Sequence, residues 1–393
     1  MNENQNTQKD PVEKQYEQWV YPKPINCLDK PFCWNYLLRH YAYWPDRDSW
    51  GKIDVLIAGC GTNQAASFAY HNPSLRVVGI DVSASSIAHE KKLKREYKID
   101  NLTLHKLAIE DVASLGCDYD LIFSHGVLHH LPDPVEGLNA LRQVLRREGA
   151  MSIMLYGKYA RPGVFVLQKL FRMLNLEQTR EAVDMVKIVL QQLSAEHPAK
   201  SWVQISPDAK FDSGLVDAFL HPRDISFSVD DCLNLLDKCG LQFQRWENNM
   251  SYYPDAFFHR NSPLYEAINK MNVPDIWKAM ELIRAMNHQF IACRKDRPKT
   301  YIIDFDSNDF LDYVPVKMLG VMTRLGTSLL DSMNYFETHL FRQIDGTITI
   351  RECIERAGFQ GDSKNIENIT RKFIRHAWRV GYIEVIIPKS KRT

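Results

Sequence analysis

The segment Asp54–Asn63 most constrains the fold of this chain, because an apolar strand there runs directly into a glycine turn. It reads Asp-Val-Leu-Ile-Ala-Gly-Cys-Gly-Thr-Asn, and the two glycines let the backbone pass close to a ligand. A second apolar run, residues 77–82, contains Asp81, which follows Gly61 by 20 residues. An acid at that position can accept hydrogen bonds from a ribose diol. The pattern predicts an α/β domain that binds a nucleoside.

A regular alternation of strands and helices continues along the chain. Strands are predicted at 53–58, 76–81, 102–107, 119–124 and 150–156, helices at 63–71, 84–97 and 134–147, and further strands at about 242–248 and 288–294. We therefore expect a Rossmann-like, mostly parallel seven-stranded sheet with helices on both faces, within a domain of residues 30–296. Such sheets bind ligands at the carboxyl ends of their strands, where the glycine turn and Asp81 lie.

The N-terminal segment is unusually aromatic. Residues 1–15 are polar and are expected to be disordered, within an arm of residues 1–29, and a helix is predicted at about 31–43. Ten aromatic side chains lie between residues 16 and 50. They either pack the arm onto the sheet or form a flap over the ligand, and plain packing is the favoured interpretation.

Residues 157–225 interrupt the alternation and predict a helical insertion. Helices are expected at 164–174 and 181–193, followed by a loop at about 207–222 that is rich in proline, aspartate and glycine. Residues 228–240 then predict a helix that begins at a serine cap and ends at a glycine. Insertions over a rigid sheet carry specificity, so we expect residues 157–225 to bind the second substrate.

The tail, residues 301–393, predicts a small α+β module after a boundary at 296–300. Helical patterns near 327–342, 349–357 and 364–380 precede a terminal strand at 382–387, an order typical of a winged-helix-like fold. One helix has a basic face, formed by Arg371, Lys372, Arg375, His376 and Arg379. A winged helix with such a face could contact nucleic acid, but a domain interface or a surface for a protein partner is the favoured interpretation. The charged run Glu90–Lys98 is interpreted as the solvated face of a helix.

Composition narrows the class of protein. The chain has 393 residues, of which 45% are hydrophobic and 25% charged, and its net charge of +1 gives no reason to expect a nucleic-acid or membrane-surface partner. Its eight cysteines include no C-x-x-C pair, so we expect free thiols in a reducing compartment. The N-terminus lacks the apolar core of a signal peptide, and no apolar run approaches the roughly 20 residues of a membrane span. These features predict a cytoplasmic protein without a membrane partner.

The glycine turn by itself does not identify the nucleoside. Gln64 stands where a dinucleotide-binding fingerprint has its third glycine. That glycine brings the helix close to the strand, and the helix N-terminus then faces the pyrophosphate of the dinucleotide. A nucleoside without phosphates does not need that close approach. The turn therefore favours such a nucleoside over NAD or FAD.

Four places in the sequence, including the glycine turn and Asp81, give the chain a resemblance to the class I S-adenosylmethionine-dependent methyltransferases. These are Val55–Thr62, Asp81, Leu107–Val112 and Tyr119–Leu131, with a similar entry to the fifth strand at Arg147–Ile153. The resemblance implies S-adenosylmethionine as cofactor, and it implies that the following residues bind it: Gly59, Cys60, Gly61, Thr62, Asn63, Asp81, Val82, Ile109, Glu110, Ser124, His125 and Gly126. One departure is Ala108, which stands where many relatives have an acid that accepts from the adenine amino group. Glu110, Asp111 or the backbone at Ile109 would then read the adenine.

Three histidines crowd the loop after the fourth strand. His125 and His129 are candidate general bases, because an imidazole suits deprotonation of an oxygen or nitrogen acceptor near neutral pH. The alternative, which we favour for each of them and for His130, is that this loop only packs along the cofactor. A metal site is not predicted, because adjacent side chains point apart and no third ligand is in register.

Tyr156, His221 and Arg223 are the candidate residues for binding the methyl acceptor. Tyr156 leaves the fifth strand, and the other two lie in a dense polar stretch of the insertion. Arg223 would clamp a carboxylate or phosphate, although an Arg–Asp pair that joins segments is the favoured interpretation. The sequence thus predicts methyl transfer to an oxygen or nitrogen of a small molecule or protein side chain. An NAD(P)-dependent oxidoreductase and a catalytically silent cofactor-binding protein remain as alternatives.

Overall fold

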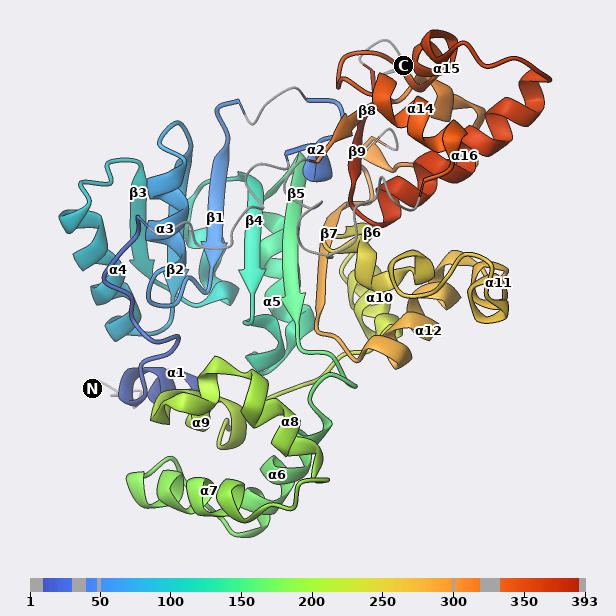
Figure 1. Ribbon diagram of the computed structural model, residues 1–393. Helices are drawn as coiled ribbons and strands as arrows, with labels where there is room; N and C mark the ends of the chain where they lie inside the picture. Colours follow the sequence, from blue (N-terminus) through green and yellow to red (C-terminus); the bar gives the residue numbers. More distant parts are fainter. Residues whose placement is uncertain (1–9, 30–39, 48–50, 299–300, 319–332, 389–393) are drawn as a thin grey trace.

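A computed structural model describes residues 10–29, 40–47, 51–298, 301–318 and 333–388. Its centre is a seven-stranded sheet with the order β3-β2-β1-β4-β5-β7-β6 (Figure 1). The strands are β1 (Asp54–Ala58), β2 (Arg76–Asp81), β3 (Leu102–Lys106), β4 (Tyr119–His125), β5 (Leu145–Leu155), β6 (Leu241–Trp246) and β7 (His288–Arg294). Strands β1 to β5 are parallel, and β7 pairs antiparallel with both β5 and β6. The predicted fold class is confirmed.

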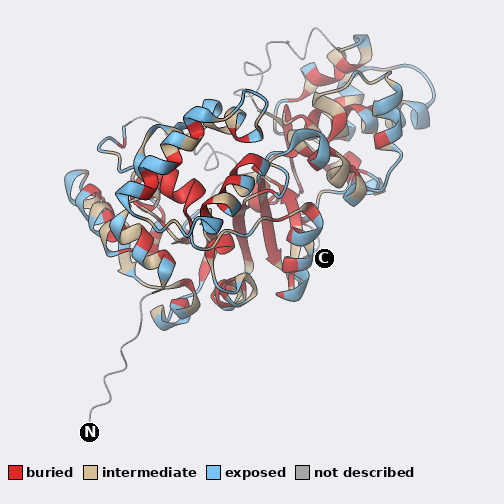
Figure 2. Cartoon of the chain, turned by 90° about the horizontal axis from the view of Figure 1, so that it is seen from below, coloured by how far each residue is buried: buried red, intermediate tan, exposed pale blue. Residues whose placement is uncertain are grey.

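Helices cover the sheet and bury its apolar strands. They are α3 (Gln64–His71), α4 (Ala84–Glu96), α5 (Pro134–Gln143), α10 (Val229–Lys238), α11 (Pro263–Asn269) and α12 (Val273–Arg284). Val55, Leu56 and Ile57 of β1 are fully buried, as expected for a parallel strand covered on both faces. Figure 2 shows this buried sheet between helices whose outer surfaces are exposed.

The fifth strand begins earlier than predicted. The sequence pattern extends a helix to residue 147, but α5 ends at Gln143 and β5 starts at Leu145. The register shifts between Tyr119 and Leu121 on the neighbouring strand, so residues 146–149 bulge out of the ladder. Arg146 binds Asp54 and Asp120 from this bulge. Pairing with a distant strand, which local periodicity does not report, therefore overrides the helical pattern.

The insertion has a hydrophobic core of its own. It consists of α6 (Pro162–Met173), α7 (Arg180–Gln192), α8 (Pro198–Ile205) and α9 (Asp212–Phe219), which lie beyond the carboxyl ends of the strands (Figure 1). The expected loop at 207–222 is wrong in part, because α9 occupies its centre. A Cβ on Gly214 would lie 2.2 Å from the Asp208 carbonyl oxygen, so this glycine permits the close approach of α9 to the preceding 3₁₀ turn, η4 (Pro207–Lys210).

The two ends of the chain add smaller elements. The N-terminal arm contains α1 (Pro11–Gln18), and α2 (His40–Tyr43) precedes β1; the rest of the helix expected at 31–43, and residues 1–9, lie outside the described residues. The tail contains β8 (Val314–Lys317), α14 (Tyr335–Gln343), α15 (Ile350–Ala357), α16 (Ser363–Arg379) and β9 (Ile383–Ile386). Part of the helix expected at 327–342 also lies outside the described residues, and the winged-helix-like resemblance stays a prediction.

Candidate cofactor cleft and acceptor cavity

The glycine turn follows β1 and is fixed against β2. Gly59 and Gly61 have positive φ angles of 79° and 55°, which side chains rarely adopt. A Cβ on Gly59 would also lie 2.3 Å from a methyl group of Val127. The backbone amides of Gly59 and Cys60 both donate to the Ile80 carbonyl oxygen at 2.9 Å. The turn therefore passes close to the strand tip that carries the next acidic residue.

That residue, Asp81, is the last residue of β2. Its Oδ2 accepts from the Gly61 amide and its Oδ1 from the Ser83 amide, each at 2.8 Å. Burial raises the pKa of the Asp81 carboxyl, and these two amide hydrogen bonds oppose the increase. Each oxygen keeps a further lone pair, so the carboxylate fits a ribose diol.

Glu90 of α4 supports the residues that follow the glycine turn. The sequence pattern assigns Glu90 to a solvated helix face, and this assignment is wrong. Glu90 is fully buried, and its two oxygens accept from the Ala65 and Ala66 amides at 2.9 and 2.8 Å. These amides are among the unpaired donors of the first turn of α3. Burial raises the pKa of Glu90 to about 8 although both hydrogen bonds oppose this. The sequence does not distinguish a buried acid such as Glu90 from the solvated charges that surround it in the run Glu90–Lys98.

A cleft of about 740 Å³ lies along these strand tips. Ten of the twelve candidate cofactor residues line it: Gly59, Cys60, Gly61, Asn63, Asp81, Val82, Ile109, Glu110, His125 and Gly126. Ser124 is buried behind the lining, and Thr62 donates from its hydroxyl to the Pro22 carbonyl at 3.0 Å. Thr62 thus holds the N-terminal arm instead of facing the cleft.

The N-terminal arm forms one wall of the cleft. Asp10, Val12, Glu13, Tyr16, Tyr21 and Pro22 all line it. The carboxylate of Asp10 binds Arg223 Nη2 through both oxygens at 2.7 Å, and Lys106 binds Glu13 at 2.9 Å. The flap interpretation therefore describes α1, whereas Tyr43 and Trp44 are buried by packing. Arg223 lines the cleft, and the favoured interpretation of it as an Arg–Asp pair matches this contact.

His125 reaches the cleft and is tied to the sheet behind it. Its Nε2 lies 2.5 Å from Ser152 Oγ, and Ser152 in turn donates to Glu247 Oε1. Because the serine hydroxyl gives its proton to the carboxylate, the His125 Nε2 must carry the proton in the other bond. Burial lowers the pKa of His125 to about 3. His125 is therefore neutral at physiological pH, and its low pKa makes it a weak general base but leaves it a fixed hydrogen-bonding group.

The other histidines form a separate group beside Tyr156. His129 is fully buried and lies outside the lining of the cleft, with its ring centroid 4.0 Å from that of Tyr156. His130 lines the cleft and stacks on His221 at 3.9 Å. Burial lowers the pKa of His129 and of His221, and that of His130 to about 4. The structure brings these residues together from η3 (Leu128–His130) and from the end of the insertion.

A second cavity of about 330 Å³ lies on the insertion side and shares Tyr156 with the cleft. Its wall includes Arg161, Trp202, Asp208 and Asp217. The Arg161 guanidinium stacks 4.0 Å from the centre of the Tyr156 ring. Burial raises the pKa of Asp217 to about 7. Of the three candidate acceptor residues, Tyr156 faces this cavity, Arg223 faces the cleft, and His221 lines neither.

Residues 56–151, which contain the turn, Asp81 and the His125 loop, match the sequence model of a family described as a methyltransferase domain. The chain contains a class I S-adenosylmethionine-dependent methyltransferase domain. The cofactor of this class is S-adenosylmethionine, as the resemblance predicted. Solved PKMT2 from Rickettsia typhi in complex with AdoHcy has a TM-score of 0.59 over 85% of this chain and 71% of that chain. The two sequences are 15% identical, so this similarity concerns the fold alone.

Curated relatives match only parts of the chain. A protein of Synechococcus sp. described as uncharacterized is 26% identical over 271 residues, which cover 66% of this chain and 64% of the relative. The tRNA 5-carboxymethoxyuridine methyltransferase of Escherichia coli is 35% identical over 130 residues, which cover 31% of this chain and 49% of the relative. The chain thus spans about half to two thirds of these proteins. Within its described part, no helix is long and apolar enough to cross a bilayer.

Proposed function

We propose that this protein transfers a methyl group from S-adenosylmethionine to an oxygen or nitrogen atom of an acceptor held by the insertion. The observation that carries this proposal is that Tyr156 lines both the cleft at the strand tips and the polar cavity of the insertion. Methyl transfer requires the acceptor atom, the methyl group and the sulfur in line, so the acceptor site must adjoin the cofactor site.

The residues of the chain supply binding and orientation. Asp81 would accept hydrogen bonds from the ribose hydroxyls, and the arm with Tyr16 and Tyr21 would exclude water from the cleft. When bound, S-adenosylmethionine supplies an activated methyl group, so a dedicated general base is not required. His125, neutral and fixed through Ser152, would orient a group in the cleft without accepting its proton.

The acceptor we propose is a small molecule or a protein side chain. The second cavity is small, and Arg161 is the one cation among the described residues that line it, beside the carboxyl groups of Asp208 and Asp217. This balance suits a compact polar group better than a polyanionic backbone. The Escherichia coli relative is named as a tRNA methyltransferase, but its match covers 31% of this chain, which is less than the cofactor domain alone. A tRNA acceptor is therefore an alternative for the test below.

Isothermal titration of the full chain with S-adenosylmethionine tests the cofactor assignment. We expect Asp81→Ala to weaken binding at least tenfold, about 1.4 kcal/mol, because two acceptors for the ribose are lost. Asp100→Ala, at an exposed position of the same domain, is the matched control. Equal affinities of wild type and Asp81→Ala would refute the ribose assignment.

A screen with methyl-labelled cofactor tests the transfer itself. Purified small-molecule, protein and tRNA fractions of a lysate would be incubated with the protein, and we expect label in a small-molecule or protein fraction. Label in tRNA alone would refute the proposed acceptor class. Tight cofactor binding without label in any fraction would favour a silent binding protein, and binding of NADH instead would favour an oxidoreductase.

A further inference from the structure

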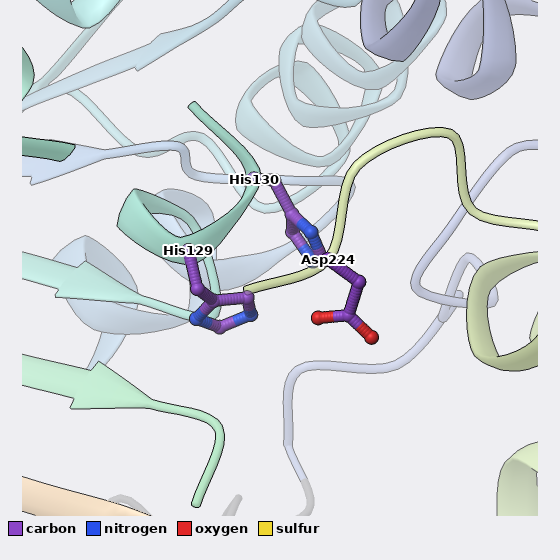
Figure 3. A group of neighbouring side chains, drawn as sticks. All are labelled: His129, His130 and Asp224. Carbon is purple, nitrogen blue, oxygen red and sulfur yellow. The ribbon is translucent and has the colours of Figure 1, made fainter. Parts of the chain in front are cut away.

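Three metal-ligand side chains converge in the wall between the cleft and the insertion. His129 and His130 lie on η3, and Asp224 lies in the segment between α9 and α10. One ligand atom from each residue lies within 4.8 Å of the others. Figure 3 shows both imidazole rings and the carboxylate gathered at one place. The sequence argument against a metal, that no third ligand is in register, does not hold in three dimensions, because Asp224 approaches from a distant segment.

Two of these side chains are buried with unsatisfied polar atoms. His129 is fully buried, and neither of its ring nitrogens has a hydrogen-bond partner among the described residues. Oδ1 of Asp224 is likewise buried and unpartnered there, and its side chain is 1% exposed. Buried polar atoms almost always have a partner, so these atoms indicate a bound species that satisfies them.

The other polar atoms of His130 and Asp224 form hydrogen bonds of the kind that metal ligands usually make. Nδ1 of His130 lies 2.9 Å from the Arg223 carbonyl oxygen, so it donates its proton there and leaves Nε2 unprotonated. Oδ2 of Asp224 accepts from Gln168 Nε2 at 2.9 Å. Metal-bound histidines typically donate their second nitrogen to a carbonyl, and metal-bound carboxylates accept further hydrogen bonds.

A neighbouring group, which combines His130 with Asp217 and His221, is less suited to a metal. Nδ1 of His221 accepts from the Arg223 amide at 3.1 Å, which uses its lone pair and leaves the proton on Nε2. Oδ1 of Asp217 accepts from the Tyr16 hydroxyl at 3.0 Å. These atoms already have partners, so they do not require an ion.

We propose that His129, His130 and Asp224 bind one divalent transition-metal ion, with Zn²⁺ as the best match to two imidazoles and one carboxylate. Nη1 of Arg161 lies 3.7 Å from Asp224 Oδ2 and opposes a cation there. The carboxyl groups of Asp224 and Asp208, and that of Asp217 when it is ionised, offset the charge of Arg161. Three protein ligands leave a coordination position for water or for an acceptor atom, beside the aromatic wall at Tyr156.

Metal titration of the full chain tests the site. After dialysis against a chelator, we expect one equivalent of Zn²⁺ or Co²⁺ to bind with submicromolar affinity and to raise the melting temperature. His129→Ala and Asp224→Asn should each weaken binding at least tenfold, in line with the loss of one ligand. His259→Ala and Asp184→Asn, both at exposed positions, are matched controls that should bind as wild type does.

Circular dichroism establishes that each variant is folded, and the nearly isosteric Asp224→Asn keeps the test decisive if His129→Ala does not fold. Wild-type protein that binds no ion would overturn the proposal. Binding that survives in both site variants would also overturn it, because it would arise elsewhere, for instance at the exposed Cys27 or Cys117. A thiolate charge-transfer band in the Co²⁺ spectrum would identify that case.

Discussion

Glu90 lies beneath the glycine turn, where its carboxyl group connects α4 to the first turn of α3. Its two oxygens accept from the Ala65 and Ala66 amides, and it is fully buried. A buried carboxyl group without a cation is more stable protonated, which is why burial raises its pKa to about 8. Glu90 therefore supports the start of α3, next to the glycine turn, through a carboxyl group that burial keeps largely protonated near neutral pH.

The contribution of Glu90 to the folding stability should fall as the pH rises from 6 to 8. Glu90 keeps its proton in the folded state up to about pH 8, whereas in the unfolded chain it loses the proton near pH 4.5. The folded state therefore binds the extra proton, and the loss of this contribution across the window is about 2 kcal/mol. Urea unfolding at several pH values would measure it.

Glu90→Gln should lose only the Glu90 contribution, because the amide does not titrate, so its stability curve should differ in slope from that of wild type between pH 6 and 8. The exposed Glu96→Gln on the same helix is the control and should keep the wild-type slope. Parallel stability curves for wild type and Glu90→Gln would contradict the prediction.

At the scale of elements, α1 closes the cleft through contacts with three other parts of the chain. Asp10 binds Arg223 of the insertion side, Glu13 binds Lys106 at the end of β3, and the Tyr16 hydroxyl donates to Asp217. The helix is only eight residues long, and isolated helices of that length are marginal in water. These contacts, and not intrinsic helix stability, therefore hold the arm over the cleft.

Asp10→Ala should accelerate cofactor release about two- to fivefold, because it removes a partly exposed ion pair that holds the arm closed. The effect should shrink at high salt, where such pairs are screened. Stopped-flow measurement of cofactor dissociation at low and high ionic strength would test this. Lys14→Ala, on the exposed face of the same helix, should release the cofactor at the wild-type rate, and an equal rate for Asp10→Ala would contradict the prediction.

At the scale of the whole molecule, the tail packs against the far edge of the sheet. Arg245 of β6 binds Glu384 of β9 through two hydrogen bonds of 2.7 and 3.0 Å, and both side chains are buried. The Ile387 amide donates to the Pro45 carbonyl, and Trp378 belongs to the same hydrophobic cluster as Trp246. The tail therefore shares its core with the methyltransferase domain, on the side away from the insertion (Figure 1).

Glu384→Ala should destabilise the full chain by about 3 to 5 kcal/mol, because it leaves the Arg245 guanidinium buried without its partner. The double variant Arg245→Met with Glu384→Leu replaces the pair by apolar groups of similar size and should be close to wild type. Urea unfolding of the three proteins would measure both effects. A single variant as stable as wild type would show that the pair does not join the tail to the sheet.

Local patterns in the sequence determined the sheet, the glycine turn and the place of Asp81 at a strand tip. These features follow from short-range rules, namely apolar strands between helices and glycine where φ is positive. The positions of Gly59, Gly61 and Asp81 along the cleft were therefore predictable, and so was the family of the domain.

Only the tertiary structure decided which distant residues meet. Asp10 pairs with Arg223, Glu90 is buried while its charged neighbours are solvated, and Asp224 lies beside His129 across 95 positions of sequence. Such contacts depend on how helices and loops pack around the sheet, and hydrophobic periodicity does not encode the partner of a polar side chain. The side of the cleft at the strand tips was thus set by local sequence, whereas the position of the arm, the cavity of the insertion and the proposed metal ligands were set by packing.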